Sequence, residues 1–499
     1  MERLSDNSER LLNLYLTERN NPMFDVLIIG CGVTGAAAAY ALARYDLRVG
    51  IIERFNDVAC GATKANSAIM HAGYDPVPGK KEAVLNRRGI KTAAKVCRSL
   101  DIEYKKLPSL VVAFNEKDME KVRELYERGI ANGVKVKLLD GDEARKAEPS
   151  LSPDVIGALW TNESAIINPW EFATAMAEVA VVNGAVLMLE NEVTGIEKND
   201  GYLTVNTDRG SYSASYVINA AGAHSPDICA MVGDTRLKAM PRSGQYYVLD
   251  KEEGAKVGSV IFGCPDENGF KGILVAPTVH GNLLVGPTSD PTDDPEDLST
   301  DPAVLSRIKA AGLKMVPGID YRNVIRQYTG IRPTTNVRDF VIDINPCCDR
   351  MIDLASIASP GLSAATAIGE EAVKLLKKAG LELKPNEFFR NSRPPVTRMK
   401  DLNRIRRRAI IKKDPAYGRI VCRCETVTEG EIVEAIHRPI PPRSIDAVKR
   451  RVGAGLGRCQ GGFCSPRVHQ ILSRELGIPM ESICLDKQGS FIITGKTKN

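Results

Sequence analysis

The chain has 499 residues, of which 43% are hydrophobic and 26% are charged, and its formal net charge is +5. A chain of this length exceeds one hydrophobic core, so we expect two to four domains. The mild positive charge does not by itself indicate nucleic acid binding, and no run of about 18 apolar residues indicates a membrane-spanning helix.

The first 22 residues are polar and lack the layout of a signal peptide, so we expect an N-terminal extension there. The chain contains twelve cysteines. Without a secretory signal, this number favours a reducing compartment, in which thiols serve metal or redox chemistry. We therefore expect a cytoplasmic protein.

A glycine-rich loop follows the first predicted strand. Residues 26–29 are Val-Leu-Ile-Ile, residues 30–35 are Gly-Cys-Gly-Val-Thr-Gly, and an alanine-rich helix follows. In such a loop the first glycine makes a tight turn, the second admits a pyrophosphate, and the third allows helix–strand packing. The loop alone also fits a simple glycine turn. A second strand ending at Glu53, about 20 residues farther on, favours a bound dinucleotide, with Glu53 on the ribose hydroxyls.

Three further segments extend this motif. Residues 60–73 are small and polar, residues 216–224 are Tyr-Val-Ile-Asn-Ala-Ala-Gly-Ala-His, and residues 359–365 open another predicted helix. Together with the glycine loop they resemble the glycine-oxidase/D-amino-acid-oxidase superfamily of FAD enzymes over about residues 23–380. The resemblance implies FAD contacts from Gly30, Gly32, Val33, Thr34, Gly35, Glu53, Arg54, Thr63, Asn66, Ser67, Val193, Ala221, Gly222, Gly361, Leu362 and Ser363.

Residues 245–249, 272–277 and 282–287 are typical strands of an antiparallel sheet, which we expect to cover the flavin ring. Arg332 matches the arginine loop of the superfamily, where the guanidinium binds an anionic substrate group. The alternative is a surface arginine that caps a turn.

The chain has five histidines, and His71 lies in the polar segment after the glycine loop. The resemblance implies that this side chain lies beside the flavin. Oxidation of an alcohol requires a base with a pKa near neutrality, so His71 is the candidate; the alternative is a structural histidine. We expect His224 to support the fold and His280 to face solvent.

Two groups of relatives compete within the superfamily. The segment from Asn66 to Gly73 resembles L-2-hydroxyglutarate dehydrogenases, whereas a cysteine tail behind a flavin region resembles the large subunit of anaerobic glycerol-3-phosphate dehydrogenases. Both groups oxidise a secondary alcohol beside an anionic arm. The architecture favours glycerol 3-phosphate as the substrate.

Residues 390–419 are rich in lysine and arginine. Such a stretch is most often a solvated linker or a docking surface for an acidic partner. A nucleic acid or anionic membrane patch is the alternative.

Four cysteines form two tight pairs near the end of the chain: Cys422, Cys424, Cys459 and Cys464. Paired thiolates at this density hold an iron–sulfur cluster or a zinc ion. The segment resembles the bacterioferritin-associated-ferredoxin-like [2Fe–2S] domain, which implies that all four cysteines ligate the cluster. Its last pair is more widely spaced than in the free-standing ferredoxin, so a structural zinc ion remains the alternative to the cluster.

We therefore expect an α/β protein with a two-dinucleotide-binding-fold FAD domain, an antiparallel β-sheet substrate domain and a small helical iron–sulfur domain. The predicted boundaries are an extension (1–22), the FAD domain (23–385) with the substrate sheet at about 80–150 and 230–330, a basic linker (386–418), the [2Fe–2S] domain (419–485) and a tail (486–499).

The predicted function is FAD-dependent oxidation of an anionic alcohol, with electrons passed singly through the cluster. The expected partner is a second flavoprotein or an electron-carrier subunit. We also expect peripheral membrane association through that partner, and no nucleic acid. The alternatives from other classes are a nucleic-acid-binding flavoprotein and a non-catalytic electron-transfer subunit.

Overall fold

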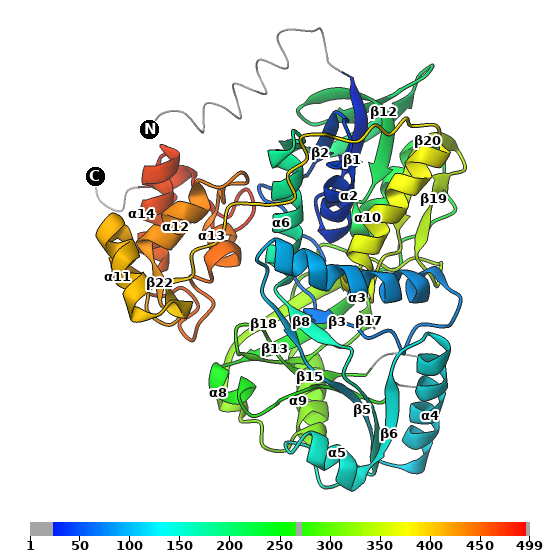
Figure 1. Ribbon diagram of the computed structural model, residues 1–499, viewed down its shortest axis with the longest axis vertical. Coiled ribbons are helices and arrows are strands. Elements are labelled where there is room, and N and C mark those ends of the chain that lie inside the picture. Colours follow the sequence, from blue (N-terminus) through cyan, green and yellow to red (C-terminus); the bar gives the residue numbers. More distant parts are fainter. Residues whose placement is uncertain (1–22, 266–271, 496–499) are drawn as a thin grey trace.

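The computed structural model describes residues 23–265 and 272–495, which form three parts (Figure 1). A mixed sheet with helices on both faces lies above a mainly antiparallel sheet, and a small helical module carries the C-terminal residues. These parts confirm the predicted α/β class. The predicted extension at residues 1–22 lies outside the described residues, as do residues 496–499 of the predicted tail.

The upper sheet has eight strands: β1 (Phe24–Ile29), β2 (Val49–Ile52), β9 (Val186–Met188), β10 (Val193–Lys198), β11 (Leu203–Thr207), β12 (Gly210–Asn219), β19 (Val341–Asn345) and β20 (Cys348–Ala355). Their order is β10-β11-β12-β1-β2-β9, and β20 pairs in parallel with the last residues of β12. β1 pairs in parallel with both neighbours. Its apolar run is buried because helices cover both faces of the sheet.

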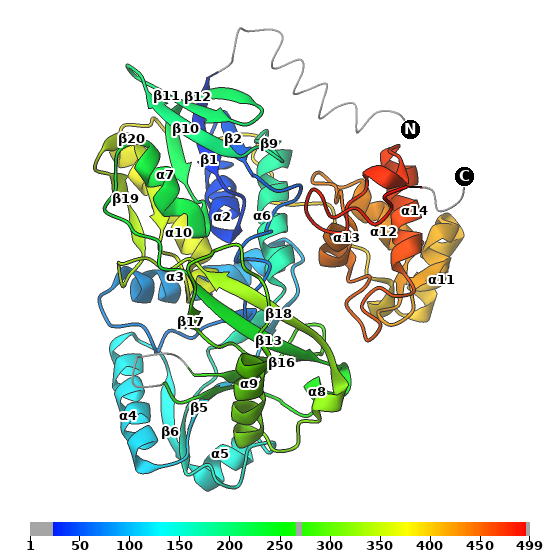
Figure 2. The same ribbon diagram turned by 180° about the vertical axis from the view of Figure 1, so that it is seen from behind.

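Five helices surround this sheet: α2 (Val33–Leu42), α3 (Lys81–Ser99), α6 (Pro169–Val182), α7 (Ser225–Met231) and α10 (Gly361–Lys378). α2, α6 and α10 share one core with Ile28, Ile51 and Ile218. α7 covers the opposite face, which Figure 2 shows from behind, and packs against Leu27 and Val217. The glycine loop therefore follows a strand, β1, whose sheet is covered by helices on both faces.

The lower sheet has nine strands: β5 (Ser109–Ala113), β6 (Val136–Asp140), β7 (Gly157–Thr161), β13 (Arg242–Leu249), β14 (Val260–Gly263), β15 (Leu274–Pro277), β16 (Leu283–Gly286), β17 (Asp290–Pro291) and β18 (Val324–Arg332). Its order is β17-β13-β16-β15-β14-β5-β7-β6, with β18 on the other edge of β13. The pairing is antiparallel except between β14 and β5, where two separate stretches of the chain meet.

Shorter elements complete this part of the fold. A third sheet joins β3 (Ile69–Met70), β4 (Tyr104–Lys106) and β8 (Ala165–Ile167). The remaining helices here are α4 (Glu116–Ala131), α5 (Gly141–Ala147), α8 (Lys251–Gly254) and α9 (Pro302–Met315). Residues of α5 and α9 pack with strands of the lower sheet in a second core.

The C-terminal module contains α11 (Arg404–Lys413), β21 (Ile420–Cys422), β22 (Val427–Thr428), α12 (Glu429–Ile436), α13 (Ile445–Val452) and α14 (Ser465–Leu476). Thr428 and Glu431 form a capping box at the start of α12. Pro466 lies in the first turn of α14, where its missing N–H costs no hydrogen bond. Val448, Val468 and other apolar residues form a small core of its own.

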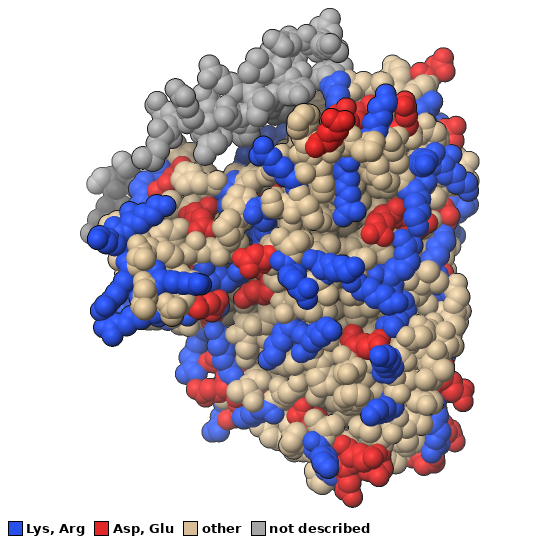
Figure 3. All heavy atoms as spheres, in the orientation of Figure 1, with Lys and Arg blue, Asp and Glu red and all other residues tan. Residues whose placement is uncertain are grey.

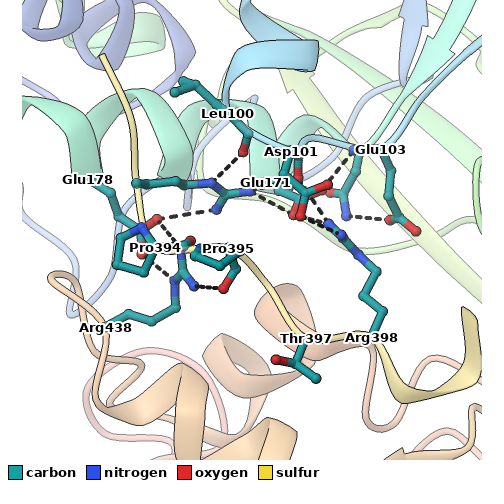
Figure 4. Close-up of polar contacts among 12 residues, drawn as sticks. Leu100, Asp101, Glu103, Glu171, Glu178, Pro394, Pro395, Thr397, Arg398 and Arg438 are labelled. Atoms are coloured by element: carbon teal, nitrogen blue, oxygen red, sulfur yellow. Dashed lines mark hydrogen bonds and ion pairs between the residues drawn. The ribbon is translucent and has the colours of Figure 1, made fainter. Parts of the chain in front are cut away.

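The module is fixed to α6 by buried ion pairs, which we call the arginine–glutamate cluster and which Figure 4 shows in part. Its members are Glu171, Glu178, Arg393, Arg398 and Arg438. Arg393 is 4% exposed and pairs with both glutamates. Arg393 and Arg398 of the predicted basic linker are therefore counter-ions for buried carboxylates and not solvated charges.

The basic helix α11 differs from the segment before it. It has no buried residue, and its lysines and arginines extend from the module, as the blue side chains at the left of Figure 3 show. No helix within the described ranges combines the length and apolar character needed to cross a bilayer.

Candidate cofactor and substrate site

A cavity of about 660 Å³ is enclosed between the two large sheets. Its size and its mixture of apolar and polar walls are those of a cofactor or ligand site. Fourteen of the sixteen predicted FAD-contacting residues line it: Gly30, Gly32, Val33, Thr34, Glu53, Arg54, Thr63, Asn66, Ser67, Val193, Ala221, Gly222, Gly361 and Leu362. Both predicted catalytic residues, His71 and Arg332, line it as well.

The glycine loop is shaped as a dinucleotide cradle. Gly30 has a φ of +95°, and a Cβ there would lie 2.6 Å from the carbonyl oxygen of Ala220. A Cβ on Gly35 would lie 1.9 Å from the Gly30 carbonyl oxygen, so only glycine allows α2 to pack this closely against the loop. Gly35 itself does not line the cavity. At Gly32 the nearest atom to a Cβ is Thr63 Oγ1 at 3.4 Å, which leaves space at the N-terminus of α2 for a pyrophosphate.

Glu53 is buried at the end of β2 and already accepts two hydrogen bonds. Its Oε2 accepts from the Cys31 N–H at 2.8 Å and its Oε1 from the Phe55 N–H at 3.0 Å. Burial raises the pKa of Glu53. The carboxylate thus holds the glycine loop in place, and its remaining lone pairs can still accept from ribose hydroxyls.

His71 lies directly after β3 and faces the start of α10. Its backbone N–H donates to Ser363 Oγ at 2.7 Å, and its Nε2 lies 3.4 Å from Ser359 Oγ. Its ring centroid lies 5.7 Å from that of Phe262. Ser363 therefore does not line the cavity but positions His71, while the N-terminal end of α10 presents Gly361 and Leu362 to the same space.

Arg332 is the most unusual charge in the site. Its Nη1 is buried and has no hydrogen-bond partner among residues 23–265 and 272–495. Burial lowers the pKa of Arg332, and no carboxylate forms an ion pair with it in that part of the chain. A buried guanidinium without a counter-ion is costly in free energy, so this position is suited to bind an anion that enters from the cavity.

Strand β13 supplies cavity-lining residues that were not among the predicted FAD contacts or catalytic residues. Arg242 and Tyr246 line the cavity, and Gly244 lies between them opposite the last residues of β18. A Cβ on Gly244 would lie 3.0 Å from Arg332 Nη1, so the glycine makes room for the guanidinium. The alternation of side chains along a strand would have identified this set once the strand direction was known.

The four tail cysteines come together in two pairs. The sulfurs of Cys424 and Cys459 lie 3.7 Å apart. The thiol of Cys464 donates to Cys422 and lowers the pKa of Cys422 to about 6. Within the described chain, no three of the four sulfurs lie within 4.8 Å of one another.

The distances between the four sulfurs distinguish a zinc ion from a [2Fe–2S] cluster. Around one zinc ion, with Zn–S bonds of about 2.3 Å, all four sulfurs would lie about 3.8 Å apart. Two separate pairs instead suit two irons that each take two thiolates. Cys422 and Cys464 are buried, whereas Cys424 is exposed. The donor set thus fits a [2Fe–2S] cluster with one edge toward solvent.

His280 does not face solvent as expected, because the C-terminal module covers it. Its side chain is 17% exposed, its Nδ1 lies 3.5 Å from Glu103 Oε2, and its ring stacks on Trp170. Burial lowers the pKa of His280 to about 4. A small gap beside it is also lined by Glu425 and Leu456 of the module.

Known proteins share both regions of the chain. Residues 25–375 match the family described as FAD dependent oxidoreductase, and residues 420–474 match the BFD-like [2Fe-2S] binding domain. A glycerol 3-phosphate dehydrogenase of Caloramator mitchellensis is 44% identical over 478 residues, which cover 96% of this chain and 99% of the relative. One of the subunits of the anaerobic glycerol-3-phosphate dehydrogenase of Escherichia coli K12 is 26% identical, with 91% of this chain and 89% of the relative covered.

Among solved structures, the dithionite-reduced L-alpha-glycerophosphate oxidase of Mycoplasma pneumoniae with FAD bound superimposes with a TM-score of 0.71. It is 31% identical, and the match covers 75% of this chain and 99% of that one. The chain therefore belongs to the FAD dependent oxidoreductase family and carries a BFD-like domain, with FAD and a [2Fe–2S] cluster as its cofactors.

Proposed function

We propose that the protein oxidises sn-glycerol 3-phosphate to dihydroxyacetone phosphate in the cavity between the two sheets. The observation that carries this proposal is the buried Arg332 Nη1, which has no partner in the described chain and lines the same cavity as His71. An anionic arm held by Arg332 would place the rest of the substrate toward His71. The glycerol 3-phosphate dehydrogenases and the glycerophosphate oxidase among the relatives also support glycerol 3-phosphate.

The residues that would hold FAD are the cavity-lining set from the glycine loop, β2, the polar segment after it, β12 and the start of α10. Bound there, FAD supplies a two-electron acceptor for the carbon-bound hydrogen of the alcohol.

The chain itself supplies the binding and proton-transfer groups. Arg332 pairs with the phosphate oxygens, because a guanidinium matches an oxyanion in a bidentate geometry. His71 accepts the hydroxyl proton at Nε2, where the substrate hydroxyl takes the place of Ser359 Oγ, which lies 3.4 Å from that nitrogen. The positive N-terminal end of α10 favours negative charge in this part of the cavity. The buried side chains of Phe262 and Tyr246 from the lower sheet also line the cavity and would limit the access of water to it.

The experiment is anaerobic mixing of the purified holoprotein with single candidate substrates. We expect sn-glycerol 3-phosphate to bleach the visible flavin absorbance, and glycerol, which lacks the anion, to leave it unchanged. Bleaching by L-2-hydroxyglutarate alone would overturn the choice of phosphate over carboxylate. No bleaching by either anion would favour an electron-transfer role without substrate chemistry.

We further propose that electrons leave through the exposed edge of the cluster to a partner subunit or electron carrier. Cys424 is exposed there, and Phe463, next to Cys464 in sequence, is 84% exposed. The Escherichia coli relative, whose name describes one of several subunits, supports a multi-subunit arrangement. If this edge is the exit, Phe463→Ser slows reduction of a protein acceptor but not the bleaching of the flavin.

A further inference from the structure

The segment behind the cluster cysteines returns to the FAD cavity. Cys484 forms backbone β-bridges with Ser444 and Phe491, and the Leu485 N–H donates to the Ser490 carbonyl oxygen at 2.7 Å. These bonds fix a turn, and two of its residues, Asp486 and Lys487, lie in the wall of the cavity. The first residues of the predicted tail are thus part of the cofactor enclosure.

Asp486 is bonded to the flavin-binding region on one side. Its Oδ2 lies 2.7 Å from Lys64 Nζ, and its carbonyl oxygen accepts from Asn56 Nδ2 at 2.8 Å. Lys64 and Asn56 line the same cavity. The turn therefore spans the wall from one cavity-lining loop to another.

On the other side, Asp486 is bonded to the [2Fe–2S] module. Arg450 of α13 lies 3.2 Å from Asp486 Oδ1 and 2.8 Å from Asp57 Oδ2. Arg451 pairs with the same Asp57, whose side chain is 1% exposed. Asp57 follows the cavity-lining Asn56 directly in sequence, so α13, the C-terminal turn and the cofactor wall are joined by one network of ion pairs, buried at Asp57, Arg450 and Arg451 and half-buried at Asp486 and Lys64.

We propose that the turn at Asp486 and Lys487 closes the FAD cavity and that FAD retention depends on the folded [2Fe–2S] module. The inference rests on the placement of FAD in this cavity. FAD leaves only when the wall opens, and opening here separates Asp486 from Lys64. Because α13 holds Asp486 through Arg450, disorder in the module weakens the same closure.

The test uses full-length holoprotein and follows the rise of flavin fluorescence as FAD dissociates after dilution. We expect Asp486→Ala to release FAD about tenfold faster, because two charge-assisted contacts are lost. Glu481→Gln, a change of an exposed acid in the same module, should release FAD at the wild-type rate. Iron, acid-labile sulfide and far-UV circular dichroism should be unchanged in both variants.

A second arm tests the dependence on the module. Removal of iron from the wild type with a chelator should accelerate FAD release, whereas the same treatment of Asp486→Ala should add little. Wild-type release rates in Asp486→Ala, or release rates that do not respond to loss of iron, would overturn the proposal.

A third variant separates this inference from the cavity assignment. A Cβ at Gly32 has room within the protein, and the side chain of Gly32→Val would project into the space for the pyrophosphate. If Gly32→Val binds FAD normally, the cavity assignment fails, and the proposal with it. If Gly32→Val loses FAD while Asp486→Ala releases it at the wild-type rate, only the role of the turn is refuted.

Discussion

Arg438 of the C-terminal module donates from Nε and Nη2 to the two carboxylate oxygens of Glu178 in α6, at 2.8 and 3.0 Å. The side chains are 6% and 0% exposed. Burial alone would raise the pKa of Glu178, but hydrogen bonds from Arg438 and the charges of Arg438 and Arg393 hold this pKa below its ordinary value. One carboxylate thus neutralises arginines from the module and from the segment that leads to it.

Replacement of this carboxylate should destabilise the protein strongly. Glu178→Gln leaves Arg393 and Arg438 buried with one charge fewer to balance them, and we expect the free energy of unfolding to fall by about 3–5 kcal/mol. Urea unfolding followed by circular dichroism measures the change. Glu127→Gln, on the exposed face of α4, is the matched control and should leave the midpoint unchanged. A shift as small as that of the control would refute a stabilising role for the cluster.

Substitution of the candidate base should separate turnover from cofactor binding. His71→Asn removes the proton acceptor, and general base catalysis contributes about 10²- to 10⁴-fold. We expect at least a 100-fold loss in the rate of flavin bleaching by saturating sn-glycerol 3-phosphate, with an unchanged ratio of FAD to protein. An equal loss of FAD would show that His71 only shapes the cavity.

Replacement of Arg332 should weaken substrate binding without lowering the thermal stability of the protein. Arg332→Met removes a buried charge that has no ion pair in the described chain, so we expect thermal stability equal to or above that of the wild type. The apparent affinity for sn-glycerol 3-phosphate should fall about 100-fold, since hydrogen bonds to a charged group are lost. Lower stability together with unchanged affinity would identify Arg332 as a structural residue.

The lowered pKa of His280 should make the stability of the protein depend on pH. Its pKa is about 4 in the folded chain and about 6.5 when unfolded. The unfolded state therefore binds more protons between these values, so this contribution is complete above pH 6.5 and is lost as the pH falls toward 4. We expect the unfolding midpoint of His280→Phe, which keeps the contact with Trp170, to fall less between pH 7 and pH 5 than that of the wild type. Parallel curves would show that His280 is not responsible.

The parts of the site that the sequence predicted are those determined within a short stretch of chain. Gly30, Gly32 and Glu53 belong to one strand–loop–helix–strand unit, whose order and glycine spacing are local properties. Local geometry of this kind needs no knowledge of the rest of the fold.

The parts that were missed depend on contacts between distant segments. His280 is neutral and buried only because the C-terminal module covers it, and Arg393 is buried only because α6 carries two glutamates. Ser363 contacts His71 instead of the cavity because α10 begins beside β3. Asp486 lies in the cavity wall although hundreds of residues separate it from Lys64. No spacing rule along the chain contains such information.

The buried ion pairs between the C-terminal module and the rest of the chain limit how this module can be exchanged between proteins. A chimera that grafts the module onto another flavoprotein would bring Arg438, Arg450 and Arg451 to a recipient surface without acids at the positions of Glu178 and Asp57. Arg438 and Arg451 would then lose their buried carboxylate partners, and Arg450 would keep only Asp486. Transfer of the module therefore requires co-transfer of these acceptor carboxylates, so donor and recipient surfaces have to be inherited as a unit.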